Sequence, residues 1–476
     1  MTIRRRPRSG SFTRETLTNP AQPEMTRLSG WGRAGSTVAQ IVPVRSPSEV
    51  IDAYRRADDR GLLARGLGRS YGDAAQNAGG LVLSTTGLDA IGPVDHSSMT
   101  VRAGAGVSLG QLMRQLVPQG LALPVLPGTS RVSVGGAIAC DVHGKNHLHV
   151  GSFASHVASL TLALSSGRVE VVTPDHPEVF WATAGGMGLT GVIVEATLRL
   201  RPISTAYVVT TTQRCAGLDR LITTMTAAAA ESHYAVAWLD IGAPGPSLGR
   251  GVVESADAAD PADVPTYPAP LRWAPPTTLP VPAGVPSGAL SWSSVRALGE
   301  ARWAWSARRG PARVRALATY LCPLDRVSGW HRFYGRSGLV QYQLAVPDGS
   351  EDVLARVLRR VAAATAPCAM AVLKRLGPQT EGYLSFPMAG WTLALDFPAD
   401  TPGLHRLLDT LDQLAIDVGG RIYLAKDSRL QPGTIAQMYP RLADWQTIRR
   451  RLDPREALIS DLARRIQLVT PGGHGA

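Results

Sequence analysis

Glycines gather in three stretches of the chain, and the first of these is Arg65-Gly-Leu-Gly-Arg-Ser-Tyr-Gly-Asp73. Closely spaced glycines allow consecutive backbone N–H groups to converge on an anion, which is how loops hold a pyrophosphate. A Rossmann dinucleotide site would require Gly-x-Gly-x-x-Gly leading directly into a helix. Here Tyr71 stands where the third glycine belongs, and Gly72, Gly79 and Gly80 follow in place of a helical pattern. The stretch therefore predicts either an unconventional phosphate loop or a tight turn that binds nothing.

The second and third glycine clusters are more specific. Pro124-Val-Leu-Pro-Gly-Thr129 precedes Val134-Gly-Gly-Ala-Ile-Ala-Cys-Asp-Val-His-Gly-Lys-Asn146, and Trp181-Ala-Thr-Ala-Gly-Gly-Met-Gly-Leu-Thr-Gly191 comes just before a strand-like segment. Prolines and glycines crowd segments that are otherwise apolar. This pattern predicts backbone that passes close to a bulky, flat ligand.

In this order and spacing, the three clusters resemble the FAD-binding domain of the vanillyl-alcohol-oxidase superfamily. Phe180-Trp-Ala-Thr183, Gln341-Tyr-Gln343 and Ala425-Lys-Asp-Ser-Arg429 are further similar to motifs of the decaprenylphosphoryl-β-D-ribose 2′-oxidase family within it. The similarity runs from about Trp31 to the C-terminal helix and weakens only in a Pro/Gly-rich stretch. The resemblance implies an α+β fold, in which a two-subdomain PCMH-type FAD-binding domain carries an inserted substrate domain.

The same resemblance implies how the chain is divided. We expect a flexible leader over residues 1–25, a FAD-binding domain over 26–204, a substrate-binding domain over 205–420, and a C-terminal segment over 421–476 that returns to the FAD domain. Residues 243–291 are dense in Pro, Gly, Ala and Ser, which predicts a surface excursion, either a lid or a disordered insertion.

The activity that the resemblance implies is oxidation of the 2′-hydroxyl of a polyprenyl-phosphate ribose, with transfer of a hydride to flavin N5. In the family, a separate short-chain nicotinamide-dependent reductase completes the epimerisation for cell-wall arabinan. Such chemistry requires a base near the hydroxyl and a cation or donor near the flavin N1/O2 edge. Lys426 matches the essential lysine of the family and could serve either role, and His143 matches the histidine beside flavin and substrate.

The remaining site residues are carried over by the same motifs. By resemblance, FAD is expected to contact Arg65, Gly66, Leu67, Gly68, Arg69, Ser70, Tyr71, Pro127, Gly128, Thr129, Gly135, Gly136, Ala139, Cys140, His143, Gly144, Asn146, Gly188, Gly191, Ile193 and Tyr423. The substrate is expected to contact Tyr71, Lys145, Trp238, Tyr320, Gln341, Gln343, Lys374, Thr392 and Ala394. No metal ion is expected.

Three positions depart from the family pattern. Covalent members of the superfamily carry a histidine where this chain has Arg69, so we expect FAD that is bound non-covalently. Ala394 replaces the pocket cysteine that nitroaromatic inhibitors trap in relatives, so we expect an active enzyme that forms no covalent adduct. Cys322 stands where relatives often have histidine, which leaves local pocket detail open.

The pattern of the chain also predicts the elements that position these residues. A capping box at Ser46 predicts a helix to about Asp58, and another at Ser108 predicts a helix to about Val117. Alternation of apolar residues predicts a hairpin over Val157–Val172, and an antiparallel sheet backed by helices in the second half of the chain. The expected strands are 37–44, 62–65, 99–103, 192–200, 341–346, 369–374, 392–397 and 421–425, the helices in the second half are 352–364 and 404–417, and the tail over 443–469 reads as a basic amphipathic helical segment.

Composition limits the class of protein. At 476 residues, 44% of them hydrophobic, the chain is expected to form two domains. Its four cysteines show no C-x-x-C spacing and read as free thiols. No apolar run approaches the roughly 18–20 residues of a spanning helix, and no signal core follows the basic start. We therefore expect a cytoplasmic or peripherally membrane-associated protein, with the periplasmic face left open.

The formal net charge is +12, which solvated arginines or attachment to an anionic membrane would explain. No motif typical of nucleic-acid binding is present, and a nucleic-acid partner is not expected. Two other functions stay open: a sugar-1,4-lactone or alditol oxidase of the same superfamily, and a non-catalytic flavin-binding sensor.

Overall fold

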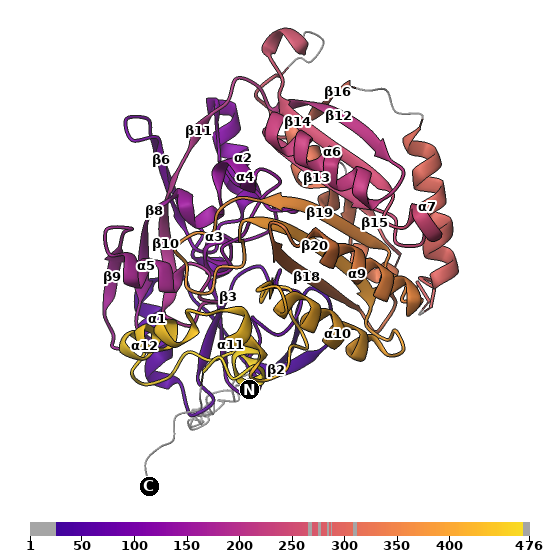
Figure 1. Cartoon of the computed structure of the whole chain (residues 1–476). Coiled ribbons are helices and arrows are strands. Elements are labelled where there is room, and N and C mark those ends of the chain that lie inside the picture. Colours follow the sequence, from indigo (N-terminus) through magenta and orange to yellow (C-terminus); the bar gives the residue numbers. More distant parts are fainter. Residues whose placement is uncertain are drawn as a thin grey trace, which may run out of the picture.

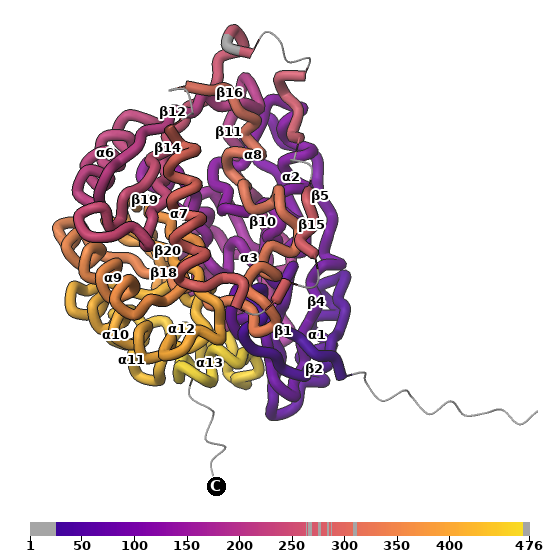
Figure 2. Tube along the Cα trace, turned by 90° about the vertical axis from the view of Figure 1, so that its right-hand side faces the viewer, coloured from indigo at the N-terminus to yellow at the C-terminus, as the bar shows by residue number. Residues whose placement is uncertain are grey.

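The computed structural model describes residues 25–264, 269–274, 278–282, 285–286, 288–307 and 312–469. The leader expected over residues 1–25 lies outside the described residues, apart from Met25. Three principal sheets organise the described chain, two formed by its N-terminal part and one by its middle part, and the C-terminal helices α11 (Thr434–Met438) and α12 (Leu442–Leu452) lie at the foot of the molecule (Figures 1 and 2).

The N-terminal part forms a four-stranded and a five-stranded sheet. The first has the order β1-β2-β4-β3, with β3 and β2 parallel to β4, and the second has the antiparallel order β5-β6-β10-β8-β9. The hairpin expected over Val157–Val172 is confirmed as β8 and β9. The strands are β1 Met25–Ser29, β2 Ser36–Pro43, β3 Leu62–Arg65, β4 Leu81–Ser84, β5 Ile91–Asp95, β6 Thr100–Gly104, β8 Val157–Ala163, β9 Val169–Val172 and β10 Val192–Arg199, and β7 Leu121–Ala122 pairs separately with β11 Arg201–Pro202.

Both helices start at the N-caps that were expected. Ser46 Oγ accepts from the Glu49 N–H at 3.3 Å, but the Glu49 carboxylate accepts from the N–H of Arg45, at 2.7 Å, and not from that of Ser46. Ser108 and Gln111 form a reciprocal box. The N-terminal helices are α1 Pro47–Arg56, α2 Leu109–Leu116, α3 Val134–Ala139, α4 His147–Val150 and α5 Pro177–Thr183.

The middle part of the chain forms an antiparallel eight-stranded sheet with the order β16-β12-β14-β13-β19-β20-β18-β21. Figure 1 shows α6, α9 and α10 against one face of it, so the expected sheet backed by helices is confirmed. Its strands are β12 Tyr207–Cys215, β13 Tyr234–Leu239, β14 Gly251–Ala258, β16 Ala312–Ala316, β18 Leu339–Pro347, β19 Met370–Leu376, β20 Gly390–Pro398 and β21 Arg421–Ile422, and the helices are α6 Leu218–Glu231, α7 Trp292–Ser306, α8 Leu317–Leu321, α9 Glu351–Ala363 and α10 Leu404–Ile416.

Side chains alternate between the two faces of this sheet. In β18, Val340, Tyr342 and Leu344 pack into the hydrophobic core beneath the helices. Gln341 and Gln343 therefore point to the opposite, inner face. All residues of β18 except the last are buried, because both faces of the sheet are covered.

Three expectations about the second half need correction. The expected excursion over 243–291 contains β14, an inner strand of the large sheet, whereas residues 265–268, 275–277, 283–284 and 287 lie outside the described residues. The strand expected over Arg421–Ala425 is only the two-residue β21, because the chain turns after Ile422. The basic tail forms two helices, α12 and α13 (Asp461–Arg465), separated by an irregular segment.

The C-terminal segment is bonded to the first sheet as well as to the large one. Leu62 of β3 donates to the carbonyl of Ala457 at 2.7 Å, and Ile459 donates to the carbonyl of Leu62 at 3.0 Å. Arg465 pairs with Asp73 at 2.8 Å. Arg465, which the sequence placed in a basic tail, thus joins the C-terminal segment to the N-terminal part. None of the described helices has the length and apolar character required to cross a bilayer.

Candidate active site

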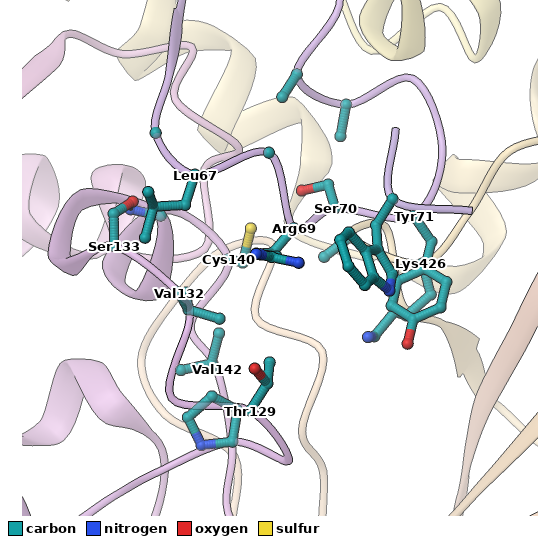
Figure 3. Close-up of a pocket in the computed structure, with 18 of the residues that line it drawn as sticks. Leu67, Arg69, Ser70, Tyr71, Thr129, Val132, Ser133, Cys140, Val142 and Lys426 are labelled. Carbon is teal, nitrogen blue, oxygen red and sulfur yellow. The ribbon is translucent and has the colours of Figure 1, made fainter. Parts of the chain in front are cut away.

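The three glycine clusters converge on one cavity, which lies between the N-terminal part and the inner face of the large sheet. Figure 3 shows labelled residues of the first two clusters around it, among them Arg69 and Cys140. Gly66, Gly128 and Gly188 each come from a different cluster and line it. Gly188 has φ +77°, and a Cβ atom at Gly128 or Gly188 would meet nothing within 4 Å. The space beside these backbones is therefore open to a ligand, as the glycines predict.

The floor of the cavity consists of β18, β19 and β20. Gln343 lies opposite Ala394, which in turn lies opposite Val372. Two residues further along β19, Lys374 lies opposite Thr392. Three neighbouring strands therefore present a row of polar and small side chains on the inner face, at the floor of the cavity.

Lys426 reaches the cavity from the turn that follows β21. The turn is fixed to the floor by the Tyr423 N–H, which donates to the Gln343 carbonyl at 2.9 Å, and to the first glycine cluster by the Tyr71 N–H, which donates to Ala425 at 3.0 Å. Lys426 Nζ lies 3.8 Å from the centre of the Tyr71 ring, and Figure 3 shows the two side chains together. The lysine is thus held over an aromatic face at the cavity wall.

Hydrogen bonds hold His143 in one tautomer. Thr392 Oγ1 donates its proton to the carbonyl of Leu344 at 2.9 Å, so it accepts from the Gln343 amide nitrogen at 3.0 Å. That nitrogen lies 3.1 Å from His143 Nε2, which must also be an acceptor, so the proton is on Nδ1. Burial, helped by nearby Lys374, holds the pKa of His143 well below its ordinary value. His143 is therefore neutral, with its basic nitrogen already engaged.

The Nδ1–H of His143 is buried and has no hydrogen-bond partner among the described residues. A buried donor left in this state costs free energy unless a ligand or water accepts from it. Because His143 lines the cavity, we infer that a bound ligand completes its hydrogen bonding.

Only three of the 49 lysines and arginines are lysine, namely Lys145, Lys374 and Lys426. Lys374 and Lys426 line the cavity, and Lys145 lies outside its lining. Burial lowers the pKa of Lys426 to about 8, while Asp396 acts in the opposite direction. Burial and the nearby Lys426 lower the pKa of Lys374 to about 7. An arginine would stay charged in the same surroundings, whereas a lysine can lose its proton there. Lysine at these two positions therefore allows a neutral amine in the cavity.

Comparison with known proteins identifies this architecture. The FAD binding domain family matches residues 38–173, and the D-arabinono-1,4-lactone oxidase family matches residues 345–466. Decaprenylphosphoryl-beta-D-ribose oxidase of Mycolicibacterium smegmatis is 40% identical over 453 residues, covering 93% of this chain and 98% of that protein. The chain belongs to the decaprenylphosphoryl-β-D-ribose oxidase family.

Other relatives of the chain agree with its assignment to the decaprenylphosphoryl-β-D-ribose oxidase family. An uncharacterized protein of Streptomyces coelicolor is 40% identical over 371 residues, covering 76% of this chain and 100% of the relative. An alditol oxidase of a Streptomyces species is 28% identical over 179 residues, 37% of this chain and 42% of that enzyme. The expected family, fold class, FAD cofactor and FAD-dependent oxidoreductase class are confirmed.

Most residues that the family resemblance assigned to the site line the cavity. They are Gly66, Leu67, Gly68, Arg69, Ser70, Tyr71, Pro127, Gly128, Thr129, Gly135, Gly136, Ala139, Cys140, His143, Gly188, Gly191, Ile193, Gln341, Gln343, Lys374, Ala394, Tyr423 and Lys426.

Four of the expected substrate contacts lie outside the cavity lining. Trp238 pairs with Val372 across the strands, so it lies one strand beyond the cavity on the same face of the sheet. Lys145 donates to the carbonyl of Tyr320, and its Nζ lies 3.9 Å from the centre of that ring. Thr392 lies beneath Gln343 and orients its amide. These residues support the far end of the site and the floor.

Three of the expected FAD contacts act on the protein itself. Arg65 donates to the carbonyls of Ser29 and Ala75, at 2.8 Å each. Asn146 donates to a backbone carbonyl of the second glycine cluster at 3.0 Å. A Cβ atom at Gly144 would stand 2.6 Å from the Asn146 side chain, so this glycine is required by packing. All three hold loops that carry other lining residues.

The sequence interpretation missed several lining residues from the middle of the chain, among them Asp325 and Trp330. Asp325 is buried and accepts from Thr129 Oγ1 at 2.5 Å, from Ser130 N at 2.9 Å and from Ser130 Oγ at 2.7 Å. It therefore fixes the second glycine cluster to the middle part of the chain. No local signal reveals this role, because its partners lie 195 residues or more away in sequence.

Replacing Asp325 with alanine is expected to weaken FAD binding about tenfold, because it leaves buried donors of the loop unpaired at about 1–3 kcal/mol each. The dissociation constant can be measured from the quenching of flavin fluorescence. Asp95→Ala is the matched control, since Asp95 also accepts from two serines but in an exposed turn away from the cavity. Equal FAD affinity in the wild type and the Asp325 variant would refute the role.

Proposed function

We propose that the chain oxidises the 2′-hydroxyl of a polyprenyl-phosphate ribose, such as decaprenylphosphoryl-β-D-ribose, to the 2′-ketone, using FAD. The observation that carries the proposal is the convergence of Lys426, Lys374 and the His143 Nδ1–H on the glycine-lined cavity. The substrate follows from 40% identity to a relative named for it, over nearly the full length of both chains.

The residues present fit FAD. Glycines of the second and third clusters leave room that a Cβ atom would fill, at Gly128 and Gly188, and His143 offers an unpaired donor. When bound, FAD supplies the acceptor for the hydride. Arg69 replaces the histidine of covalent members, and its guanidinium lies 4.0 Å from the Trp31 ring centre. Acid precipitation should therefore release the flavin.

In the proposed reaction, neutral Lys426 removes the proton of the sugar hydroxyl. Its lowered pKa makes the neutral amine available near pH 8, whereas His143 Nε2 already accepts from Gln343. His143 then acts as a donor through Nδ1. Lys374 regains its proton beside an anionic part of the ligand, because a nearby negative charge favours the ammonium form.

The division of the chain belongs to the same proposal. Residues 26–204, with the segment 421–476 returning to them, form the FAD-binding domain, and residues 205–420 provide the floor for the substrate. The ketone is released as an intermediate, and a short-chain nicotinamide-dependent reductase, a separate protein, reduces it to complete the epimerisation in arabinan synthesis.

One observation favours a second candidate, a sugar-1,4-lactone or alditol oxidase. The family match over residues 345–466 is to D-arabinono-1,4-lactone oxidase, and an alditol oxidase is among the relatives. These enzymes would bind FAD in the same kind of cavity, so the substrate that reduces the flavin distinguishes the two candidates. Anaerobic titration of the purified flavoprotein is expected to bleach its visible absorption with polyprenyl-phosphoribose and not with an aldonolactone or alditol. The opposite pattern would reject the proposed substrate.

The Ala394 position makes a separate prediction. Ala394 lines the cavity opposite Gln343. By the family resemblance, relatives carry a thiol at this position that traps nitroaromatic inhibitors. The wild type is therefore expected to form no adduct during turnover with a nitroaromatic inhibitor, whereas Ala394→Cys forms one adduct per chain. Intact-protein mass spectrometry measures this, with Ala394→Ser as the control. A stoichiometric adduct on the wild type would contradict the prediction.

A further inference from the structure

Three short segments, all described, form a connected surface at one side of the cavity: residues 31–35, 278–282 and 324–337. Leu279–Pro280 (β15) pairs in parallel with Val327–Ser328 (β17), and Arg332 donates to the Val281 carbonyl at 2.8 Å. The ring of Trp31 packs against that of His331, with centroids 5.0 Å apart. Figure 2 views the side of the molecule that carries β15. We call this surface the rim.

Two large apolar side chains of the rim face solvent. Leu279 is 68% exposed and Phe333 is 46% exposed. They extend from backbone that β15, β17 and the Arg332 hydrogen bond hold in place, so the side chains stand out from a fixed surface. Exposed apolar groups beside a cavity mark a contact surface.

The charge of the rim is almost entirely positive. Arg33, Arg326 and Arg336 are exposed and Arg332 is half-buried, whereas the single acidic residue of the three segments, Asp325, is buried against Thr129 and Ser130. Asp400, outside the three segments, accepts from Ser337 at 3.0 Å. The surface therefore carries a clear excess of cations.

The rim is continuous with the cavity, because three residues of the rim also line the cavity: Trp31, Val327 and Trp330. Whatever covers the rim therefore lies against this side of the cavity. We propose that the rim docks onto an anionic lipid surface, so that a lipid-linked substrate passes from the membrane into the cavity. This inference rests on the proposed function, which assigns such a substrate.

A membrane fits the rim better than a protein partner. Interfacial binding combines apolar side chains inserted among acyl chains with arginines that attract anionic headgroups. The rim offers both, on a surface next to the cavity that a membrane-embedded substrate must enter.

The test is co-sedimentation of the full-length holoprotein with vesicles of phosphatidylcholine, with and without phosphatidylglycerol. Leu279→Ser combined with Phe333→Ser is expected to lower the partition coefficient about tenfold or more. Arg326→Glu is expected to lower it about tenfold, only on phosphatidylglycerol vesicles and less at high salt. The matched control combines Val171→Ser, which removes a side chain 67% exposed on β9, with Arg114→Glu on α2.

Unchanged binding in the rim variants, or an equal loss in the control, would overturn the proposal. So would a wild type that does not bind phosphatidylglycerol vesicles. Flavin content and melting temperature establish that each variant is folded. A wild type that binds vesicles through the rim, but whose flavin is not bleached by detergent-solubilised polyprenyl-phosphoribose, would reject the proposed function and leave the docking intact. Bleaching in detergent without vesicle binding would reject the docking alone.

Discussion

Lys426→Met is expected to lower the rate constant of flavin reduction by polyprenyl-phosphoribose about 10²- to 10⁴-fold, the usual effect of losing a positioned general base. Methionine keeps the length and much of the volume of the side chain, so FAD content should not change. The rate constant is measured by anaerobic stopped-flow absorption. A loss of less than tenfold in a variant that is fully loaded with FAD would show that another group takes the proton.

The pH dependence decides which of two roles Lys426 has. If it is the base, the neutral amine is the active form, so the rate of reduction rises with pH through about 8. If it stabilises charge on the reduced flavin, the ammonium is active and the rate falls through the same range. Lys426→Arg separates the roles again, because arginine keeps the charge and does not lose its proton. We expect a rising profile and an inactive arginine variant.

The second large effect is expected at Gly66. A Cβ atom at this position would stand 2.1 Å from Ser133 Oγ, and that hydroxyl caps α3 by accepting from the Gly136 N–H at 3.3 Å. Gly66→Ala must therefore displace the first glycine cluster or the cap of α3, both of which line the cavity. With a packing cost of about 1–3 kcal/mol, FAD affinity should fall about 10- to 100-fold. Equilibrium titration of the apoprotein with FAD measures it.

A double-mutant cycle distinguishes this contact from general destabilisation. Ser133→Gly removes the clashing hydroxyl and its Cβ, and on its own should cost only a few tenths of a kcal/mol as a helix cap. Combined with Gly66→Ala, it should restore most of the lost FAD affinity. If the double variant binds FAD no better than Gly66→Ala does, the contact with Ser133 is not the reason that position 66 requires glycine.

Local pattern was enough to predict much of the fold. Leu62–Arg65 is bounded as expected, and the hairpin over Val157–Val172 and the strands over 341–346 and 392–397 were found because their apolar residues alternate. The strand Gly251–Ala258 was missed because it lies within a Pro/Gly/Ala-rich stretch, where composition indicated a loop. Its strand state depends on the neighbours β12 and β13, which local pattern does not reveal.

The site was predictable only where motifs carry it. The glycine clusters and Lys426 stand in matched motifs, and the structure brings them to one cavity. Asp325 and Trp330 stand in no such motif, because their roles come from contacts with residues far away in the sequence. Lys145 and Trp238 were expected to touch the substrate, yet they lie beyond the cavity lining. Sequence motifs therefore identified the residues that line the cavity, whereas the residues that hold them in place could be found only from the structure.

The scarcity of lysine makes the site accessible to selective chemical labelling. Apart from the N-terminal amine, an acylating reagent or an aldehyde with borohydride finds primary amines only at Lys145, Lys374 and Lys426. Burial lowers the pKa of all three, to about 7 for Lys374 and about 8 for Lys145 and Lys426, so all three should be nucleophilic near neutrality. Amine modification, normally spread over a protein surface, should here act as an affinity reagent, and protection by a bound ligand would map what occupies the cavity.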